Sequence, residues 1–207
     1  MLKVAGHVKK HYKACCTVFE DFKNRNGVKA TFEEFLRFVE QWAEKNFPPD
    51  GEERDCFRGD MLEILAEMFF KAFENSPTVG LKDYTPVPLP EDYGVDGHGV
   101  NANGTPCAAQ VKYRGDPSNL VTYAEIARTY TSGRTQLGLA LEGDDTIFVF
   151  TSASGVTVAC QTVLGKKVRV LNREAIAKEI DNNVSFWQLA YDEIKDTLLP
   201  GSKTDIS

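Results

Sequence analysis

The strongest constraint on the fold is the turn segment Asn-Ala-Asn-Gly at residues 101–104, which separates two segments of strand character. An Asn-Gly pair that ends a three-residue loop, with the glycine in the left-handed region, is typical of a β-hairpin with a type I turn and a bulge. We therefore predict a hairpin between residues 93–100 and 106–114. With residues 102–104 as the loop, its register places Asp96 opposite Gln110.

This register decides which polar side chains share a face of the sheet. Cross-strand partners point the same way and side chains alternate along a strand, so Asp96, Gln110 and Lys112 are expected on one face. A two-residue Asn-Gly turn would shift the register by one residue and send Asp96 to the opposite face. The polar cluster therefore depends on a loop with an odd number of residues.

The rest of the chain alternates between helical and strand patterns. Thr31 followed three residues later by Glu34 is a capping-box pattern at the start of a helix. The run 145–153 is continuously apolar and rich in β-branched and aromatic residues, which is typical of a buried central strand. The predicted helices cover residues 7–24, 31–47, 57–75, 121–132, 156–164, 173–181 and 185–198, and the predicted strands outside the hairpin cover 82–88, 145–153 and 167–172.

This order predicts an α/β (α+β) fold in which a mixed β-sheet core is flanked by helices on both faces. We assign residues 1–50 to an N-terminal helical extension and residues 51–198 to the core. Residues 199–207 resemble a linker or tail. The boundary is placed near Pro48, at the start of a Pro-Pro-Asp-Gly break in the helical pattern.

The composition favours a cytoplasmic protein. The 207 residues, 42% of them hydrophobic, suffice for one good core. No run approaches the roughly 18 apolar residues of a membrane span, and the polar start lacks the apolar stretch of a secretory signal. The five cysteines are scattered, without the spacing of a disulfide framework or a zinc ribbon. We expect no membrane partner and no secretion; for a viral protein, the host cytosol or nucleus would be the compartment.

The charge distribution is uneven along the chain. The net charge of −6 counts against nucleic-acid binding, because proteins that bind phosphates are usually basic. However, residues 61–110 carry seven acidic and two basic side chains, whereas residues 111–174 carry eight basic and six acidic ones. An acidic pocket beside a mildly basic surface suits a protein that binds cations at one place and polyanions next to it.

The hairpin cluster has the chemistry of a site for a hard cation. A carboxylate and an amide oxygen, from Asp96 and Gln110, are ligands suited to Mg²⁺ or Mn²⁺, and the Val111 carbonyl between the strands could add a third. A lysine beside them could position a water or stabilise charge on a phosphate. An aspartate in a turn or a lysine at a strand end is also common without any function. Gln110 favours the functional interpretation, because it interrupts an apolar run where an apolar residue would cost less.

These residues resemble a known family. The segment Gly-Val-Asp-Gly, whose aspartate is separated by thirteen residues from Gln-Val-Lys-Tyr-Arg, resembles the PD-(D/E)xK, or restriction-endonuclease-like, nuclease superfamily, and most closely its Mrr-like branch, in which glutamine replaces the acid of the (D/E)xK pair. The family pattern also has a glutamate on the preceding helix. Glu63, in Gly-Asp-Met-Leu-Glu, matches it, and Glu67 is its competitor one turn further on. Pro90 does not directly precede the aspartate, as the family name would require.

The resemblance implies a metal-dependent endonuclease that acts on DNA, with RNA not excluded. Asp96, Gln110 and Glu63 would bind Mg²⁺ or Mn²⁺, assisted by the Val111 carbonyl, and Lys112 would orient the attacking water. Domains of this branch are often fused to helicase or translocase modules, so the chain could be the N-terminal part of a longer enzyme; a homodimer is a further possibility. The expected phosphate contacts are Arg114, Arg128, Arg134, Lys166 and Lys167.

Two other interpretations stay open. The chain could be a non-catalytic nucleic-acid-binding or assembly domain that keeps the nuclease fold. Alternatively, the hairpin cluster could be incidental in a structural protein, in which case Glu63, Asp96 and Lys112 would lie far apart in space.

Overall fold

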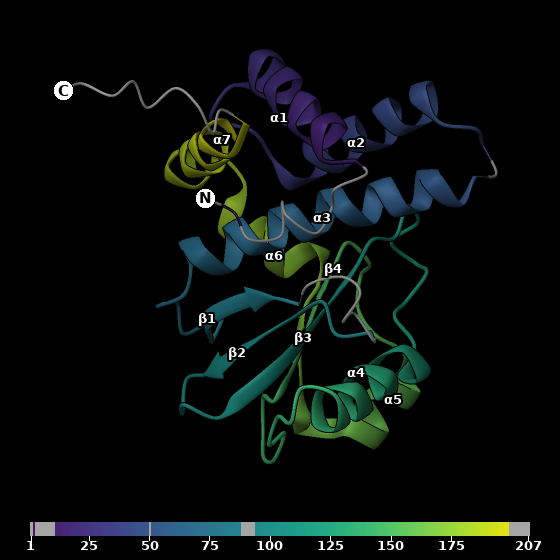
Figure 1. Cartoon of the computed structure of the whole chain (residues 1–207), viewed down its shortest axis with the longest axis vertical. Coiled ribbons are helices and arrows are strands. Elements are labelled where there is room, and N and C mark those ends of the chain that lie inside the picture. Colours follow the sequence, from purple (N-terminus) through teal and green to yellow (C-terminus); the bar gives the residue numbers. More distant parts are fainter. Residues whose placement is uncertain (1, 3–10, 50, 88–93, 199–207) are drawn as a thin grey trace.

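The computed structural model describes residues 2, 11–49, 51–87 and 94–198, with the backbone alone for 196–198. Its centre is one open, mixed sheet of five strands in the order β1-β2-β3-β4-β5 (Figure 1). The first three strands form an antiparallel meander, and the last two run parallel to β3. The strands are β1 (Leu81–Pro86), β2 (Gly97–Asn101), β3 (Pro106–Lys112), β4 (Ile147–Thr151) and β5 (Val168–Leu171).

Helices cover both faces of this sheet, as the sequence predicts (Figure 1). On one side α3 lies against the sheet and is covered in turn by α1 and α2, with α6 and α7 alongside. On the other side lie α4 and α5, and a single 3₁₀ turn, η2 (Gly165–Lys167), leads into β5. The helices are α1 (Tyr12–Asn26), α2 (Phe32–Asn46), α3 (Glu52–Ala72), α4 (Tyr123–Thr135), α5 (Val158–Leu164), α6 (Arg173–Ile180) and α7 (Val184–Leu198).

The main hydrophobic core joins the N-terminal helices to the sheet. Phe22 of α1 and Phe35 of α2 pack on each other and on Trp187 of α7, with ring centroids 5.4 to 5.9 Å apart. The same buried cluster continues through α3 to the side chains of Phe148 and Phe150 on β4. Residues on either side of the boundary drawn at Pro48 therefore share one core.

The opposite face of the sheet carries two smaller clusters under α4 and α5. One of them is built around Val149 and Ile126, and the other around Ala108 and Leu141. Because side chains alternate along a strand, Ala108 and Gln110 of β3 face this side, whereas Ala109 and Val111 face the main core. The even-numbered residues of β3 thus point toward α4.

The hairpin between β2 and β3 has the predicted register. Gly97 pairs with Ala109 and Val100 with Pro106, so one further step brings Asp96 opposite Gln110. Gly104 has a φ of +79°, and its N–H donates to the Asn101 carbonyl over 2.9 Å. The three-residue loop is therefore confirmed, and with it the face on which the polar side chains lie.

Several element boundaries differ from the prediction. Helix α3 begins at Glu52, five residues before the predicted start, because the acidic residues of the Gly-Glu-Glu segment form its first turn, where they interact well with the helix dipole. Strand β2 begins only at Gly97, so Asp96 directly precedes it. The predicted tail and the predicted residues 7–10, 88 and 93 lie outside the described residues. In the part of the chain that the structure describes, no helix has the length and apolar character of a membrane span.

Candidate functional site

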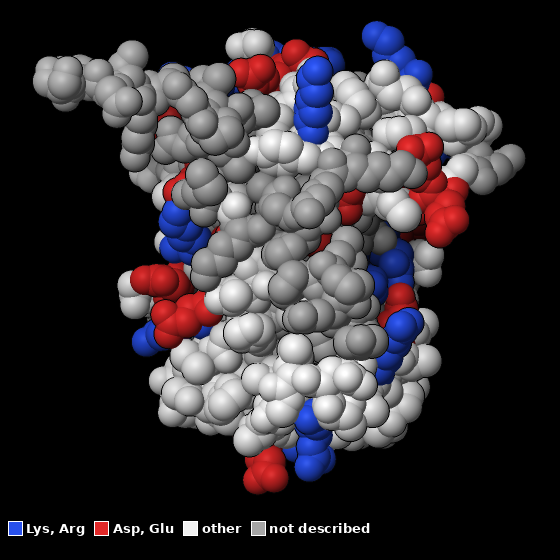
Figure 2. All heavy atoms as spheres, viewed as in Figure 1, with Lys and Arg blue, Asp and Glu red and all other residues white. Residues whose placement is uncertain are grey.

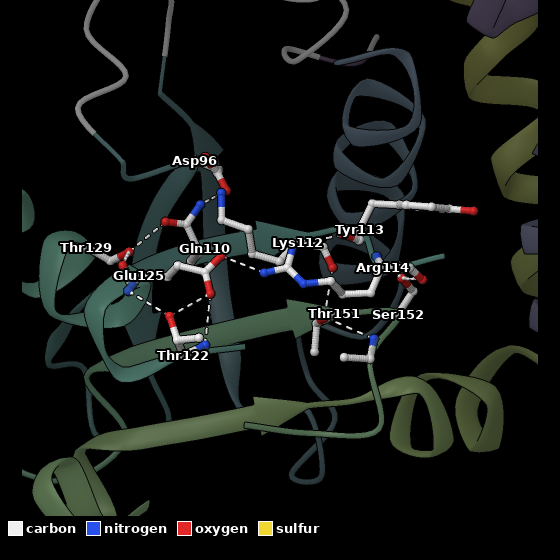
Figure 3. Close-up of polar contacts among 11 residues, drawn as sticks. Asp96, Gln110, Lys112, Tyr113, Arg114, Thr122, Glu125, Thr129, Thr151 and Ser152 are labelled. Carbon is white, nitrogen blue, oxygen red and sulfur yellow. Dashed lines mark hydrogen bonds and ion pairs between the residues drawn. The ribbon is translucent and has the colours of Figure 1, made fainter. Parts of the chain in front are cut away.

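Asp96 is held by its backbone on both sides and turns its carboxylate back over β3. Its N–H donates to the Ala109 carbonyl and its C=O accepts from the Val87 N–H, both over 3.0 Å. The carboxylate oxygen Oδ2 accepts from the Val111 N–H over 2.5 Å. It also accepts from the Gln110 side-chain amide (Figure 3). Only 8% of Asp96 is exposed. The charge is thus fixed in position and largely removed from water.

Gln110 connects Asp96 to helix α4. It is 1% exposed, its Nε2 donates to Asp96, and its Oε1 accepts from the Thr129 hydroxyl over 2.6 Å (Figure 3). Because a carboxylate can only accept, the nitrogen end of the amide must face Asp96 in this arrangement. The glutamine that interrupts the apolar run of β3 therefore has a partner at each end.

The Val111 carbonyl points to the same side of β3 as Asp96. The Ala109 carbonyl and the Val111 N–H both bond to Asp96, whereas the Ala108 N–H and the Lys112 carbonyl bond toward β4. The N–H and C=O of one strand residue point to the same neighbour, so the Val111 carbonyl faces the Asp96 side. The predicted third oxygen ligand thus lies on the side where a cation bound to Asp96 would be.

Lys112 lies on the same face as Gln110, two residues further along β3. Its half-buried side chain points back toward Asp96 (Figure 3). Among the described residues it forms no ion pair, and its backbone carbonyl accepts from the Thr151 hydroxyl over 2.7 Å. The ammonium group therefore points toward the carboxylate without forming an ion pair with it.

Glu63 and Glu67 of α3 lie near this site through Tyr84 of β1. Burial raises the pKa of Tyr84 well above its ordinary value, and the nearby carboxylates of Asp96, Glu63 and Glu67 raise it further, in that order. Such an effect falls off with distance, so each of the three carboxylates lies within electrostatic range of the Tyr84 hydroxyl. Glu67 is 7% exposed and stays a competitor for the role of Glu63.

Of the five predicted phosphate contacts, two lie near the site. Arg114 follows Lys112 by two residues, and its guanidinium bonds to Glu125 of α4 over 2.5 Å and to the Tyr113 carbonyl over 3.0 Å. Burial alone would raise the pKa of Glu125, but hydrogen bonds from Thr122 and the ion pair with Arg114 hold it below its usual value. Arg128 is exposed on α4, and its aliphatic stem packs at the position where a Cβ on Gly94 would lie.

The other three lie at the opposite end of the parallel strands. The Lys166 and Lys167 carbonyls accept from Asp145 and Thr146 at the start of β4, whereas the Arg114 N–H bonds Ser152 just after its end. The five residues of β4 span about 13 Å at the usual strand rise. Arg134 and Lys167 both lie over the Tyr130 ring, 5.5 and 5.9 Å from its centroid. These cations are therefore not brought together with Lys112.

Two residues of the site, Tyr84 and Thr129, were not predicted from the sequence. Tyr84 was part of a weak strand pattern, and its ring end packs against Gly97, where an added Cβ would come within 2.4 to 2.6 Å of it. Thr129 lies inside a helical pattern that gives no sign of the glutamine beneath it. A glycine directly after the aspartate was the available signal for a close approach of another side chain.

The donor set suits a hard divalent cation. Asp96 offers a carboxylate oxygen and Val111 a carbonyl oxygen, and oxygen ligands of this kind are those that Mg²⁺ and Mn²⁺ prefer. The Gln110 amide oxygen, the other predicted ligand, is instead turned toward the Thr129 hydroxyl. Within the described ranges, no group of three or more histidine, cysteine, aspartate or glutamate side chains is arranged to hold a metal ion. Any metal site here would therefore combine few carboxylates with amide and backbone oxygens.

Comparison of the chain with protein-family models, with curated proteins and with solved structures found no match.

Proposed function

We propose that the chain is a divalent-metal-dependent nuclease domain that hydrolyses phosphodiester bonds in DNA with Mg²⁺ or Mn²⁺. The observation that carries the proposal is the position of Lys112, whose side chain points toward a buried Asp96 carboxylate that the Val111 and Gln110 groups contact. The residue types, their order and their elements agree with the resemblance to the Mrr-like branch. Two further points stay predictions: that the chain is the N-terminal part of a larger helicase- or translocase-type enzyme, and that it forms a homodimer.

Each residue has a distinct role in this proposal. When bound, a divalent cation supplies stabilisation of negative charge on the scissile phosphate and a lower pKa for bound water. Asp96 holds the cation, together with the Val111 carbonyl and one of the α3 glutamates. Lys112 orients the attacking water and lies next to the charge that develops on the phosphate.

The rigidity of the site supports a catalytic role. Asp96 is fixed through its own backbone and through the Val111 N–H, and β3 and β4 continue beneath it as a buried parallel pair. Groups that are already oriented do not have to reorganise during the reaction, so each contributes more than a mobile surface charge would.

A non-catalytic nucleic-acid-binding or assembly domain is the second candidate function. One observation favours it: the Gln110 amide already gives Asp96 a buried hydrogen-bond partner, so the carboxylate needs no cation for its stability. Calorimetry separates the two functions, because the second one predicts no binding of Mn²⁺ at millimolar concentration.

The test of the nuclease function is cleavage of supercoiled and linear DNA, and of RNA, in Mg²⁺ or Mn²⁺. Asp96→Asn and Lys112→Ala should each lower the rate by about 100-fold or more while circular dichroism shows a folded chain. Asp144→Asn and Lys82→Ala, which change exposed charges elsewhere, are matched controls and should cleave normally. Undiminished cleavage by both site variants would contradict the proposal.

A further inference from the structure

The amide of Gln110 presents its nitrogen to the place where the proposed cation requires an oxygen. Nε2 faces the Asp96 carboxylate, and Oε1 is turned away toward the Thr129 hydroxyl, 2.6 Å distant. Since the amide is 1% exposed, water cannot replace either contact without opening the structure. For Gln110 to act as a ligand, its amide must rotate by half a turn about its terminal bond.

The surroundings of Thr129 allow this rotation with the loss of one hydrogen bond, the one from Nε2 to Asp96 that the cation would replace. Its hydroxyl has one proton and three acceptors within reach: Gln110 Oε1 at 2.6 Å, the Gly94 carbonyl at 2.8 Å and the Glu125 carbonyl at 3.3 Å. If the proton turns to Gly94, the hydroxyl oxygen can accept from Gln110 Nε2 instead. The two orientations of the amide have nearly the same shape, so the core around it need not repack.

We propose that Thr129 is a positioning residue that lets Gln110 respond to a cation. Without the cation, Nε2 holds Asp96 and Thr129 donates to Oε1. With the cation, Oε1 faces it, Nε2 donates to Thr129, and Thr129 donates to Gly94. The inference rests on the proposed function, because it concerns the same cation site, but it adds a residue on α4 that neither the resemblance nor the sequence pattern assigns.

The threonine hydroxyl matters because it can act in both directions. A valine at this position keeps the shape but removes the donor to Oε1 in the cation-free chain and the acceptor of Nε2 in the bound chain. Because a buried N–H without an acceptor is tolerated less well than a carbonyl without a donor, the bound chain loses more and cation binding should weaken on the order of 10-fold. A serine keeps the hydroxyl and should bind the cation within about two-fold of the native chain. Thr131 provides a matched control on the same helix, since it is exposed and its hydroxyl donates to the Ala127 carbonyl over 2.9 Å.

The experiment is calorimetric titration of Mn²⁺ into the full chain without nucleic acid, for the native protein and for Thr129→Val, Thr129→Ser and Thr131→Val. We expect weak binding for Thr129→Val alone. In parallel, the side-chain amide signals of Gln110 are followed by ¹⁵N NMR while Mg²⁺ is added, which needs no variant. They should shift strongly in the native chain, because the proton acceptor changes from a carboxylate to a hydroxyl.

The outcomes separate the two proposals. No Mn²⁺ binding by the native chain overturns the metal-dependent function and this inference together. Native binding with equal affinity in Thr129→Val, or equal weakening in Thr129→Ser, overturns the role of Thr129 and leaves the nuclease proposal standing. If Thr129→Val does not fold, an unchanged Gln110 amide signal in the native chain on saturation with Mg²⁺ would also overturn it.

Discussion

Gln110 lies in the middle of a short series of polar contacts that runs from Asp96 on the sheet to Thr129 on α4. An amide in this position gives the aspartate a donor without adding a second negative charge. Two carboxylates in contact would repel each other unless a cation or a proton lay between them. The glutamine therefore lowers the dependence of the apo site on a metal, and an acid here should raise it.

Gln110→Glu tests this at the residue scale. Without metal, the variant should lose about 1 to 3 kcal/mol of unfolding free energy at neutral pH, because Asp96 loses a donor and gains a like charge. Repulsion between the two acids should raise the pKa of the pair, so that the pair takes up a proton as the pH falls toward about 5. The loss of unfolding free energy should therefore shrink at lower pH. With Mn²⁺ the variant should bind more tightly than the native chain. Thermal unfolding at both pH values, with and without Mn²⁺, measures each effect.

The matched control is Gln161→Glu, which adds the same charge on the exposed face of α5. It should change stability by less than about 0.5 kcal/mol and should not alter Mn²⁺ binding. A metal-free loss that does not shrink at lower pH would mean that charge repulsion with Asp96 is not its cause.

At the scale of the elements, the sequence predicts best what local chemistry determines. The Thr31 capping box forms with both of its hydrogen bonds, and the Asn-Gly loop sets the register that brings Asp96 to Gln110. The predicted start of α3 was wrong, because its acidic first turn lacks the apolar stripe on which the prediction relied. Tyr84 could not be predicted as part of the site, since only the fold places it over Gly97.

The cysteines test how these elements are packed. Cys15 and Cys16 of α1, Cys107 of β3 and Cys160 of α5 are buried, and Cys56 of α3 is exposed. Burial raises the pKa of Cys16 to about 11 and that of Cys107 to about 12. A raised thiol pKa keeps the unreactive protonated form in the folded chain. One thiol should therefore react rapidly with an aromatic disulfide reagent near pH 8, and all five in denaturant.

Cys56→Ser is the control for this assignment, because it should abolish the rapid phase without changing the slow one. If any thiol still reacts rapidly in Cys56→Ser, then α1, β3 or α5 is less well packed than described. The slow thiols should react at a rate that follows unfolding.

At the scale of the whole molecule, charge is mixed rather than gathered. On the face shown in Figure 2, acidic and basic side chains are scattered among each other, in keeping with the net charge of −6. Nucleic acid would therefore bind through a local group of cations rather than a broad basic field. The sequence indicates five candidates for this group, but it does not show which of them lie near Lys112. Arg128 and Arg134, for example, both belong to α4 but lie toward opposite ends of the sheet.

The structure offers a group that shares only Arg114 with those five, at the end of β3 near Lys112. Arg37 of α2, Arg114 and Arg173 of α6 border a hollow of about 160 Å³ there, with Glu33 and Glu40 among its other lining residues. Arg173 is paired with Glu33 and Arg114 with Glu125, whereas exposed Arg37 has no ion-pair partner among the described residues. We call Arg37, Arg114 and Arg173 the edge arginines.

If DNA approaches Lys112, it should pass over the edge arginines and not over Arg134 and Lys166. The variant Arg37→Ala/Arg114→Ala should weaken binding of a short duplex by about 10-fold. The slope of log affinity against log salt concentration should also become less steep by about one to two, because fewer phosphate contacts release fewer counterions. Arg134→Ala/Lys166→Ala removes the same charge at the opposite end of the sheet and should bind within about two-fold of the native chain. Binding is measured with Ca²⁺, a hard cation of the same charge, in place of Mg²⁺, and unfolding temperatures establish that both variants fold. A greater loss in Arg134→Ala/Lys166→Ala would place the nucleic acid at the start of β4, where it could not reach Asp96, and would separate binding from the proposed cation site.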